Sequence, residues 1–378
     1  MRAIMLAGLL VARCVYAAIP DVNAPQMITP DGLAKIIAAS QQATDADLAQ
    51  KLSGLELTAR LGGAQLAALG SKLPGEKSRM ALMILADRSI FLPPPAEDIL
   101  VETAPTGAAA QQMLVSIVNY VNTTVRQLPN LMATRFTDAF EDQPGENILT
   151  STGVEVVTQL PLHWVGSLGM EVTYRDRKEV EDLSVKARKK GAGVSGLITS
   201  GEFGPILSTI LSDALKSNKI GWIRWEKGPD GTLSVFHYQV PEDKSNYYVQ
   251  FCCIMEDMNS SGGHHQLFTE RAAYHGDIAF NPADGSIRFL TLEADMSKGE
   301  LVTGARIAVE YAPTRIAGRS YICPVRSVSM LQAHTAQQST MFSMADYKGR
   351  VKTFLNDVTF SDYLRFGSKV RILASDNN

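Results

Sequence analysis

Residues 220–240 read IGWIRWEKGPDGTLSVFHYQV, and this stretch decides the fold class. Two runs rich in aromatic and β-branched residues flank the turn sequence Pro-Asp-Gly, which predicts a β-hairpin. If Trp225 lies opposite Ser234, then Ile223 faces Phe236. One face of the hairpin is then apolar and the other is polar, as is typical of an antiparallel sheet that packs on a core with one face.

The next predicted strand, residues 247–255, continues the same alternation of apolar and polar side chains. We therefore predict that three successive strands share one apolar face and that this face lines an elongated cavity. Its side chains are the candidate ligand-binding residues: Ile223, Trp225, Phe236, Tyr238, Val249 and Phe251.

Further hairpins are predicted around turns at 282–285 and 317–318, with a closing strand at 357–366. One amphipathic helix, expected from Glu202 to Lys216, interrupts the strands with a single apolar stripe that fits the surface of a sheet. We expect this helix to form a lid, and its stripe begins with Phe203, Ile206, Leu207 and Ile210.

The N-terminal part has a different pattern. Residues 28–92 predict short helices, with start signals at Thr29 and Thr44. Three prolines at 93–95 end this region, and the segment to Gly107 lacks periodicity. We predict a helical domain over 18–92, a linker over 93–107 and a β-rich domain over 108–378, hence an α+β fold.

The first 17 residues have the pattern of a signal peptide. Arg2 precedes a short apolar run, and small side chains at Val15 and Ala17 suit cleavage after Ala17. The apolar run is shorter than the ~20 residues that a membrane-spanning helix needs. We therefore expect a periplasmic or secreted protein whose mature chain has no transmembrane segment.

Composition and motifs exclude several function classes. A formal net charge of −3 gives no electrostatic basis for binding nucleic acid. The string GAGVSG at 191–196 matches a dinucleotide fingerprint, but it lacks the preceding apolar strand, and it narrowly misses a nucleophile elbow. His264, His265 and His275 could bind a metal with Glu270, although adjacent histidines point apart. We expect neither a cofactor nor a metal.

The cysteines leave one question open. Export would permit a disulfide between Cys323 and either Cys252 or Cys253. In a meander that keeps its strand order, however, these positions lie too far apart for a bridge.

The C-terminal part resembles the envelope lipoprotein-carrier superfamily (LolA, LolB and RseB) over residues 108–372. The resemblance rests on a helix at 108–127 that leads into a strand at 131–140, and on segments 280–287, 309–324 and 356–363. It implies a curved half-barrel sheet with a helical lid, which holds acyl chains or senses lipoproteins. Segments 184–200 and 256–272 depart from the pattern.

Three functions follow as hypotheses. The first is a non-catalytic envelope protein that holds lipid or lipoprotein in the half-barrel. The second is a structural or regulatory interaction module, in which the apolar face is ordinary core and the N-terminal helices dock an envelope protein partner. The third is an enzyme that uses the histidine-containing loop. An apolar cavity favours the first hypothesis, and a filled core favours the second.

Overall fold

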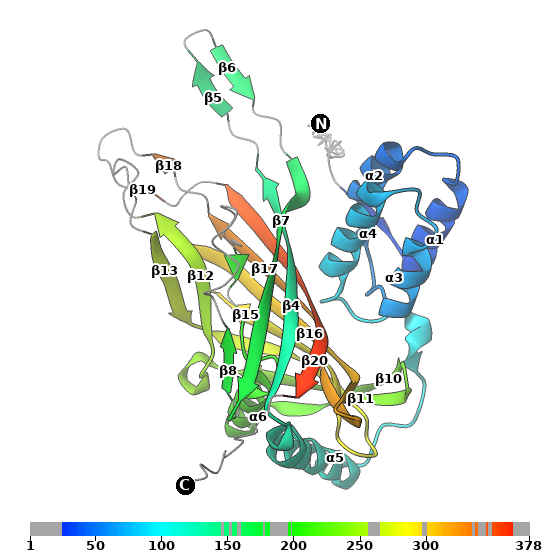
Figure 1. Ribbon diagram of the computed structural model, residues 1–378, viewed down its shortest axis with the longest axis vertical. Helices are drawn as coiled ribbons and strands as arrows, with labels where there is room; N and C mark the ends of the chain where they lie inside the picture. The colour runs from blue at the N-terminus through cyan, green and yellow to red at the C-terminus, as the bar shows by residue number, and fades with distance from the viewer. Residues whose placement is uncertain are drawn as a thin grey trace, which may run out of the picture.

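An antiparallel sheet of 11 strands dominates this α+β fold, and it does not close on itself (Figure 1). The computed structural model describes residues 25–144, 147–150, 153–156, 160–176, 178–181, 196–197, 199–255, 265–296, 301–334, 337–338, 345–346 and 350–365. No helix in these ranges is long and apolar enough to cross a membrane.

The sheet includes strands from both ends of the β-rich region, because the last strand, β20, inserts between β17 and β4. In spatial order, the strands are β3 (Ile99–Leu100), β10 (Ile220–Gly228), β11 (Gly231–Val240), β14 (Ala273–Phe280), β15 (Ile287–Asp295), β16 (Val302–Ile316), β17 (Arg319–His334), β20 (Val351–Arg365), β4 (Leu131–Gln143), β7 (Leu160–Arg175) and β8 (Lys178–Glu181).

Four helices and a small parallel strand pair make up the N-terminal helical region, which we call the helical domain and whose buried apolar residues form a separate cluster. Its elements are β1 (Gln26–Ile28), α1 (Pro30–Ala39), α2 (Asp45–Ser53), β2 (Leu55–Leu57), α3 (Gly63–Gly70) and α4 (Glu76–Ser89). Both predicted start signals are confirmed, since the hydroxyl oxygens of Thr29 and Thr44 accept hydrogen bonds from main-chain N–H groups in the first turns of α1 and α2.

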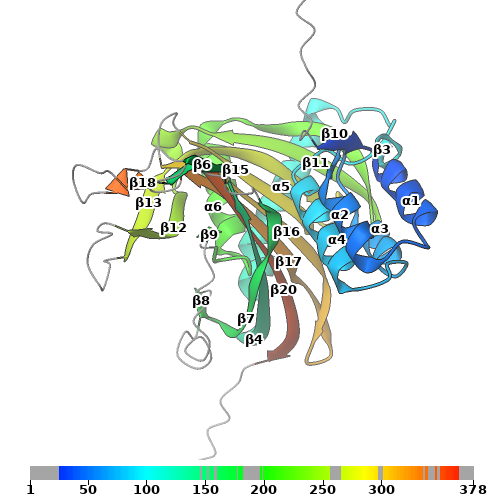
Figure 2. The same cartoon turned by 90° about the horizontal axis from the view of Figure 1, so that it is seen from above.

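Helices α5 (Gly107–Asn119) and α6 (Pro205–Ser217) pack on one face of the sheet, which we call the inner face. A π-helical turn (η2, Tyr120–Thr124) and a 3₁₀ turn (η3, Val125–Gln127) extend α5, so the predicted helix over 108–127 is confirmed. Figure 2 shows that the sheet is bent rather than flat.

The helical domain covers the opposite, outer face of the sheet. Ile90 packs on Ala308 and Val328, and the guanidinium group of Arg60 lies 4.5 Å from the centre of the Phe289 ring. The outer face therefore also carries a buried interface.

The connecting segment 93–107 is bound to the edge of the sheet. It contains a 3₁₀ turn (η1, Ala96–Asp98) and strand β3, which pairs with β10. The indole N–H of Trp225 donates a hydrogen bond of 3.1 Å to the carbonyl oxygen of Thr103. These contacts fix the path of the chain between the helical domain and α5.

Three predicted hairpins are confirmed: β10–β11, β14–β15 and β16–β17. The prediction that the next strand continues the meander is wrong. Strand β12 (Tyr248–Met255) leaves the main sheet and lies between β13 (His265–Arg271) and β9 (Gly196–Leu197), and β14 takes its place beside β11. The remaining elements are β5 (Asn147–Thr150), β6 (Gly153–Val156), η5 (Glu242–Lys244), β18 (Gln337–Gln338) and β19 (Ala345–Asp346).

A β-bulge in β10 changes part of the predicted hairpin register. Trp225 pairs with Ser234 as predicted, but Phe236 pairs with Trp222 and not with Ile223. The extra residue leaves Ile223 unpaired and 43 % exposed. Ile223 is therefore not part of the apolar inner face.

A glycine at position 276 allows β14 and β15 to pair beside a buried tyrosine. The hydroxyl of Tyr238 donates a 2.6 Å hydrogen bond to the carbonyl oxygen of Thr291, and a Cβ atom at Gly276 would overlap that same oxygen. We expect Gly276→Ala to lower the free energy of unfolding by about 1–3 kcal/mol, because the strand must shift. Denaturant unfolding measures the loss.

The matched control is Gly221→Ala in β10, where an added Cβ meets no atom within 4 Å. We expect its effect to stay within about 0.5 kcal/mol. Equal effects of the two substitutions would show that the space at Gly276 is not required.

Candidate functional site

Most of the predicted ligand-binding side chains belong to one packed core on the inner face. Phe236, Tyr238, Val249 and Phe251 are buried in a single cluster, and Trp225 packs partly buried against it. The rings of Phe236 and Phe280 lie 5.4 Å apart, centre to centre. Val249 and Phe251 reach the cluster from β12, although that strand is outside the main sheet.

The predicted lid helix belongs to the same core. Helix α6 begins at Pro205 rather than Glu202, and its Leu207 and Ile210 are buried in the inner-face cluster, with Ile206 partly buried against it. Phe203 precedes the helix and packs in a neighbouring cluster against Phe360. This packing is what we expect of a filled core.

The histidine-containing loop is only partly described. His264 lies outside the described residues, as do residues 191–195 of the glycine-rich string, and the side chain of His265 is not described. His275 lies on the outer face, where its Nδ1 is 3.1 Å from Asp295. Across the described ranges, no three His, Cys, Asp or Glu side chains are arranged to hold a metal ion.

Cys323 is a buried free thiol, whose pKa is raised by burial. The side chains of Cys252 and Cys253 lie outside the described set. The predicted signal peptide, residues 1–17, also lies outside it.

A groove of about 550 Å³ lies between the helical domain and strand β7, in a place that the sequence analysis did not identify. This volume is in the range of ligand-binding clefts, which combine apolar walls with a few polar groups. Three elements line the groove: Ala49, Gln50 and Ser53 of α2, Glu76, Lys77, Met80, Ala81, Ile84 and Arg88 of α4, and Pro161, Leu162, His163 and Trp164 of β7.

Strand β7 is unusual because little of it is covered between Leu160 and Glu171. Trp164 is 48 % exposed, and Leu160 and Val165 are also exposed. On the side away from β4, β8 pairs only with Val172–Arg175. Within the described part of the chain, no strand pairs with the rest of this edge.

The groove-lining Trp164 is held in place by polar contacts. Its indole N–H lies 3.3 Å from a carboxylate oxygen of Asp138 and 3.2 Å from the hydroxyl of Ser167, which itself donates a hydrogen bond to Asp138. An exposed tryptophan with its N–H fixed presents a preorganised apolar surface to a ligand.

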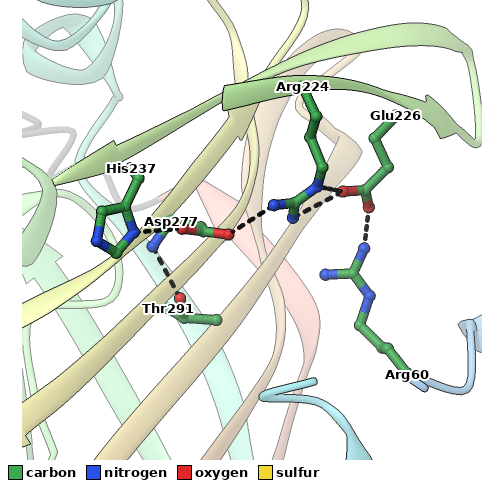
Figure 3. A network of polar contacts seen from close by, with 6 residues as sticks. All are labelled: Arg60, Arg224, Glu226, His237, Asp277 and Thr291. Carbon is green, nitrogen blue, oxygen red and sulfur yellow. Dashed lines mark hydrogen bonds and ion pairs between the residues drawn. The ribbon is translucent and has the colours of Figure 1, made fainter. Parts of the chain in front are cut away.

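Two polar clusters fix the helical domain, and with it the other wall of the groove. In the first, Arg60 of the helical domain forms an ion pair with Glu226, to which Arg224 also binds (Figure 3). Arg224 reaches Asp277 at 3.1 Å, and Nδ1 of His237 lies 2.8 Å from the other carboxylate oxygen of Asp277. Burial, together with the nearby charge of Arg224, lowers the pKa of Arg60 to about 10.

The second cluster surrounds Arg326 of β17. Its guanidinium group binds Asp87 of α4, contacts Asp357 at 3.0 Å and reaches Glu310 at 3.4 Å. One cation therefore faces three carboxylates from three different elements. Within this cluster, Asp87 is completely buried, and its second oxygen accepts no hydrogen bond from any described residue.

No protein-family model, curated protein or solved structure matches this chain. The resemblance to lipoprotein carriers therefore stays a prediction from the sequence.

Proposed function

We propose that this protein is a non-catalytic interaction module of the bacterial envelope, and that its groove binds an extended apolar segment of a partner polypeptide. The observation that carries the proposal is the edge of β7 from Leu160 to Glu171, which has no strand partner among the described residues and lies next to the groove. A partner strand could pair with the main chain of β7 and place alternate apolar side chains against Met80 and Trp164, which is the arrangement of β-strand addition.

The packing of the inner face favours this hypothesis over acyl-chain carriage in a half-barrel. A carrier needs space along the apolar face, whereas Phe236 and Tyr238 are buried against the cluster that includes α6. The groove is apolar too, but a lipid would leave the main-chain donors and acceptors of β7 unused. A polypeptide uses both the groove and the edge.

The envelope location rests on the N-terminal sequence. The short apolar run after Arg2 and the small residues Val15 and Ala17 favour export and cleavage. An exported interaction module would meet its partner in the periplasm or outside the cell.

Selection from a library of displayed peptides tests the proposed binding site. We expect enriched peptides to have apolar side chains at alternate positions and to bind Met80→Glu at least about tenfold more weakly than the wild type, because the new carboxylate faces an apolar ligand. The control Val115→Glu adds the same charge to an exposed position on α5. It should bind like the wild type.

Equal binding to both variants and the wild type would contradict a site in the groove. Native mass spectrometry of protein purified without detergent tests whether the groove binds lipid instead. A co-purified acyl lipid that is lost in Met80→Glu would assign the groove to lipid and overturn the polypeptide assignment.

A further inference from the structure

Several carboxylates gather around one guanidinium group where α4 packs on the sheet. Asp87 from α4, Asp357 from β20 and Glu310 from β16 all face Arg326 from β17. Asp138 from β4 pairs across the sheet with Asp357, which places a fourth carboxylate nearby. Arg60 of the helical domain also interacts with the charge of Glu310, so the four carboxylates share two guanidinium groups. Asp87 and Asp357 are buried, whereas Glu310 is partly exposed.

Such an interface favours binding a proton. A buried carboxylate without enough hydrogen-bond donors is more stable in its neutral form. Asp87 meets both conditions, since it is 0 % exposed and one of its oxygens has no partner among the described residues. Burial and the charge of Asp357 raise the pKa of Asp87 well above its ordinary value.

We propose that protonation of this carboxylate cluster controls how tightly the helical domain docks on the sheet, and thereby couples the groove to pH. The cluster connects to both walls of the groove. Asp87 lies on α4, which lines one wall, and Asp138 holds Trp164, which lines the other. The coupling to binding rests on the proposed function of the groove, whereas the effect on docking does not.

The direction of the pH effect follows from proton linkage. Because the pKa of Asp87 is higher when it is docked than its ordinary value of 3.8, the docked state binds a proton more tightly. The resulting stabilisation is complete below pH 3.8 and is lost as pH rises through the raised pKa. Docking is therefore tighter in acid and looser in alkaline solution.

Thiol labelling of Ala308→Cys in the full chain tests whether docking of the helical domain depends on pH. Ala308 is fully buried against Ile90 at the interface, so a maleimide reaches a cysteine there only after the helical domain lifts away. The labelling rate is read from the mass of the peptide containing residue 308, in the wild-type background and with Asp87→Asn. Comparing the two at each pH removes the intrinsic pH dependence of the thiol.

Asp87→Asn mimics the neutral carboxyl group at every pH. The wild-type background should label at least about tenfold faster than Asp87→Asn at pH 8, since one unit of pKa difference corresponds to a tenfold change in equilibrium. The ratio should be smaller at pH 5.5, and it approaches one only near the ordinary pKa of 3.8. A ratio that is constant with pH, slower labelling in the wild-type background at pH 8, or no labelling at any pH overturns the proposal.

The affinity of a selected peptide, measured at the same pH values, distinguishes the effect of pH on docking from its effect on binding in the groove. We expect binding to weaken with rising pH in the wild type and to stay constant in Asp87→Asn. If labelling responds to pH but the affinity does not, docking of the helical domain depends on pH and the peptide does not bind in the groove. A labelling ratio that is constant with pH would contradict pH-dependent docking, whether or not the affinity for the peptide changes.

Discussion

Phe236→Glu should destroy the folded state of the β-rich domain. Phe236 is 2 % exposed and packs on Phe280 in the cluster that also includes α6. A carboxylate at this position would be buried without a cation, and we expect the free energy of unfolding to fall by more than about 4 kcal/mol. Far-ultraviolet circular dichroism and denaturant unfolding measure the loss.

Ile223→Glu is the matched control, because both residues were predicted to share the apolar face. The bulge in β10 leaves Ile223 43 % exposed, so the substitution should change stability by less than about 0.5 kcal/mol. A folded Phe236→Glu variant that merely loses an acyl ligand would contradict the filled core and restore the carrier hypothesis.

Arg326→Met should weaken the whole interface between the helical domain and the sheet. The substitution keeps an apolar stem of similar length but leaves Asp87 and Asp357 buried without their cation. Removing one partner of a buried ion pair costs about 3–5 kcal/mol, which we expect as the loss of unfolding free energy at neutral pH. Denaturant unfolding at pH 7 gives this value.

Two further variants test whether the loss of stability comes from the carboxylate cluster around Arg326. Arg319→Met removes an exposed arginine from the same strand and should be nearly neutral. Adding Asp87→Asn to Arg326→Met should recover part of the loss, because one of the unpaired charges is then absent. Equal losses for Arg319→Met and Arg326→Met would contradict a specific role for the cluster.

The local parts of the fold were predictable because their signals are local. The turn at Pro229–Gly231 and the helix starts at Thr29 and Thr44 depend on residues a few positions apart, and the structure confirms them. The bulge at Ile223 left no such signal. The alternation of side chains across it still fits a regular strand, and only the partner strand decides which residue is skipped.

Long-range arrangement could not be derived in the same way. The pattern of β12 fits either a continued meander or the separate three-stranded sheet that it forms with β9 and β13. The alternation of side chains does not determine which strand lies beside it. The groove arises from the docking of α4 beside β7, about 80 positions apart in sequence. Trp164 gave no signal in the sequence, because an aromatic residue in a strand is ordinarily buried and only the structure shows that this strand is largely uncovered.

Hydrogen exchange of the main-chain amides, with and without a selected peptide, tests most directly whether the groove and the edge of β7 are the binding site. We predict that the peptide slows exchange between Leu160 and Glu171 and in α4, while β11 and α6 stay unchanged. Slower exchange in β11 and α6, with no change in β7, would place the ligand at the inner face and contradict binding in the groove.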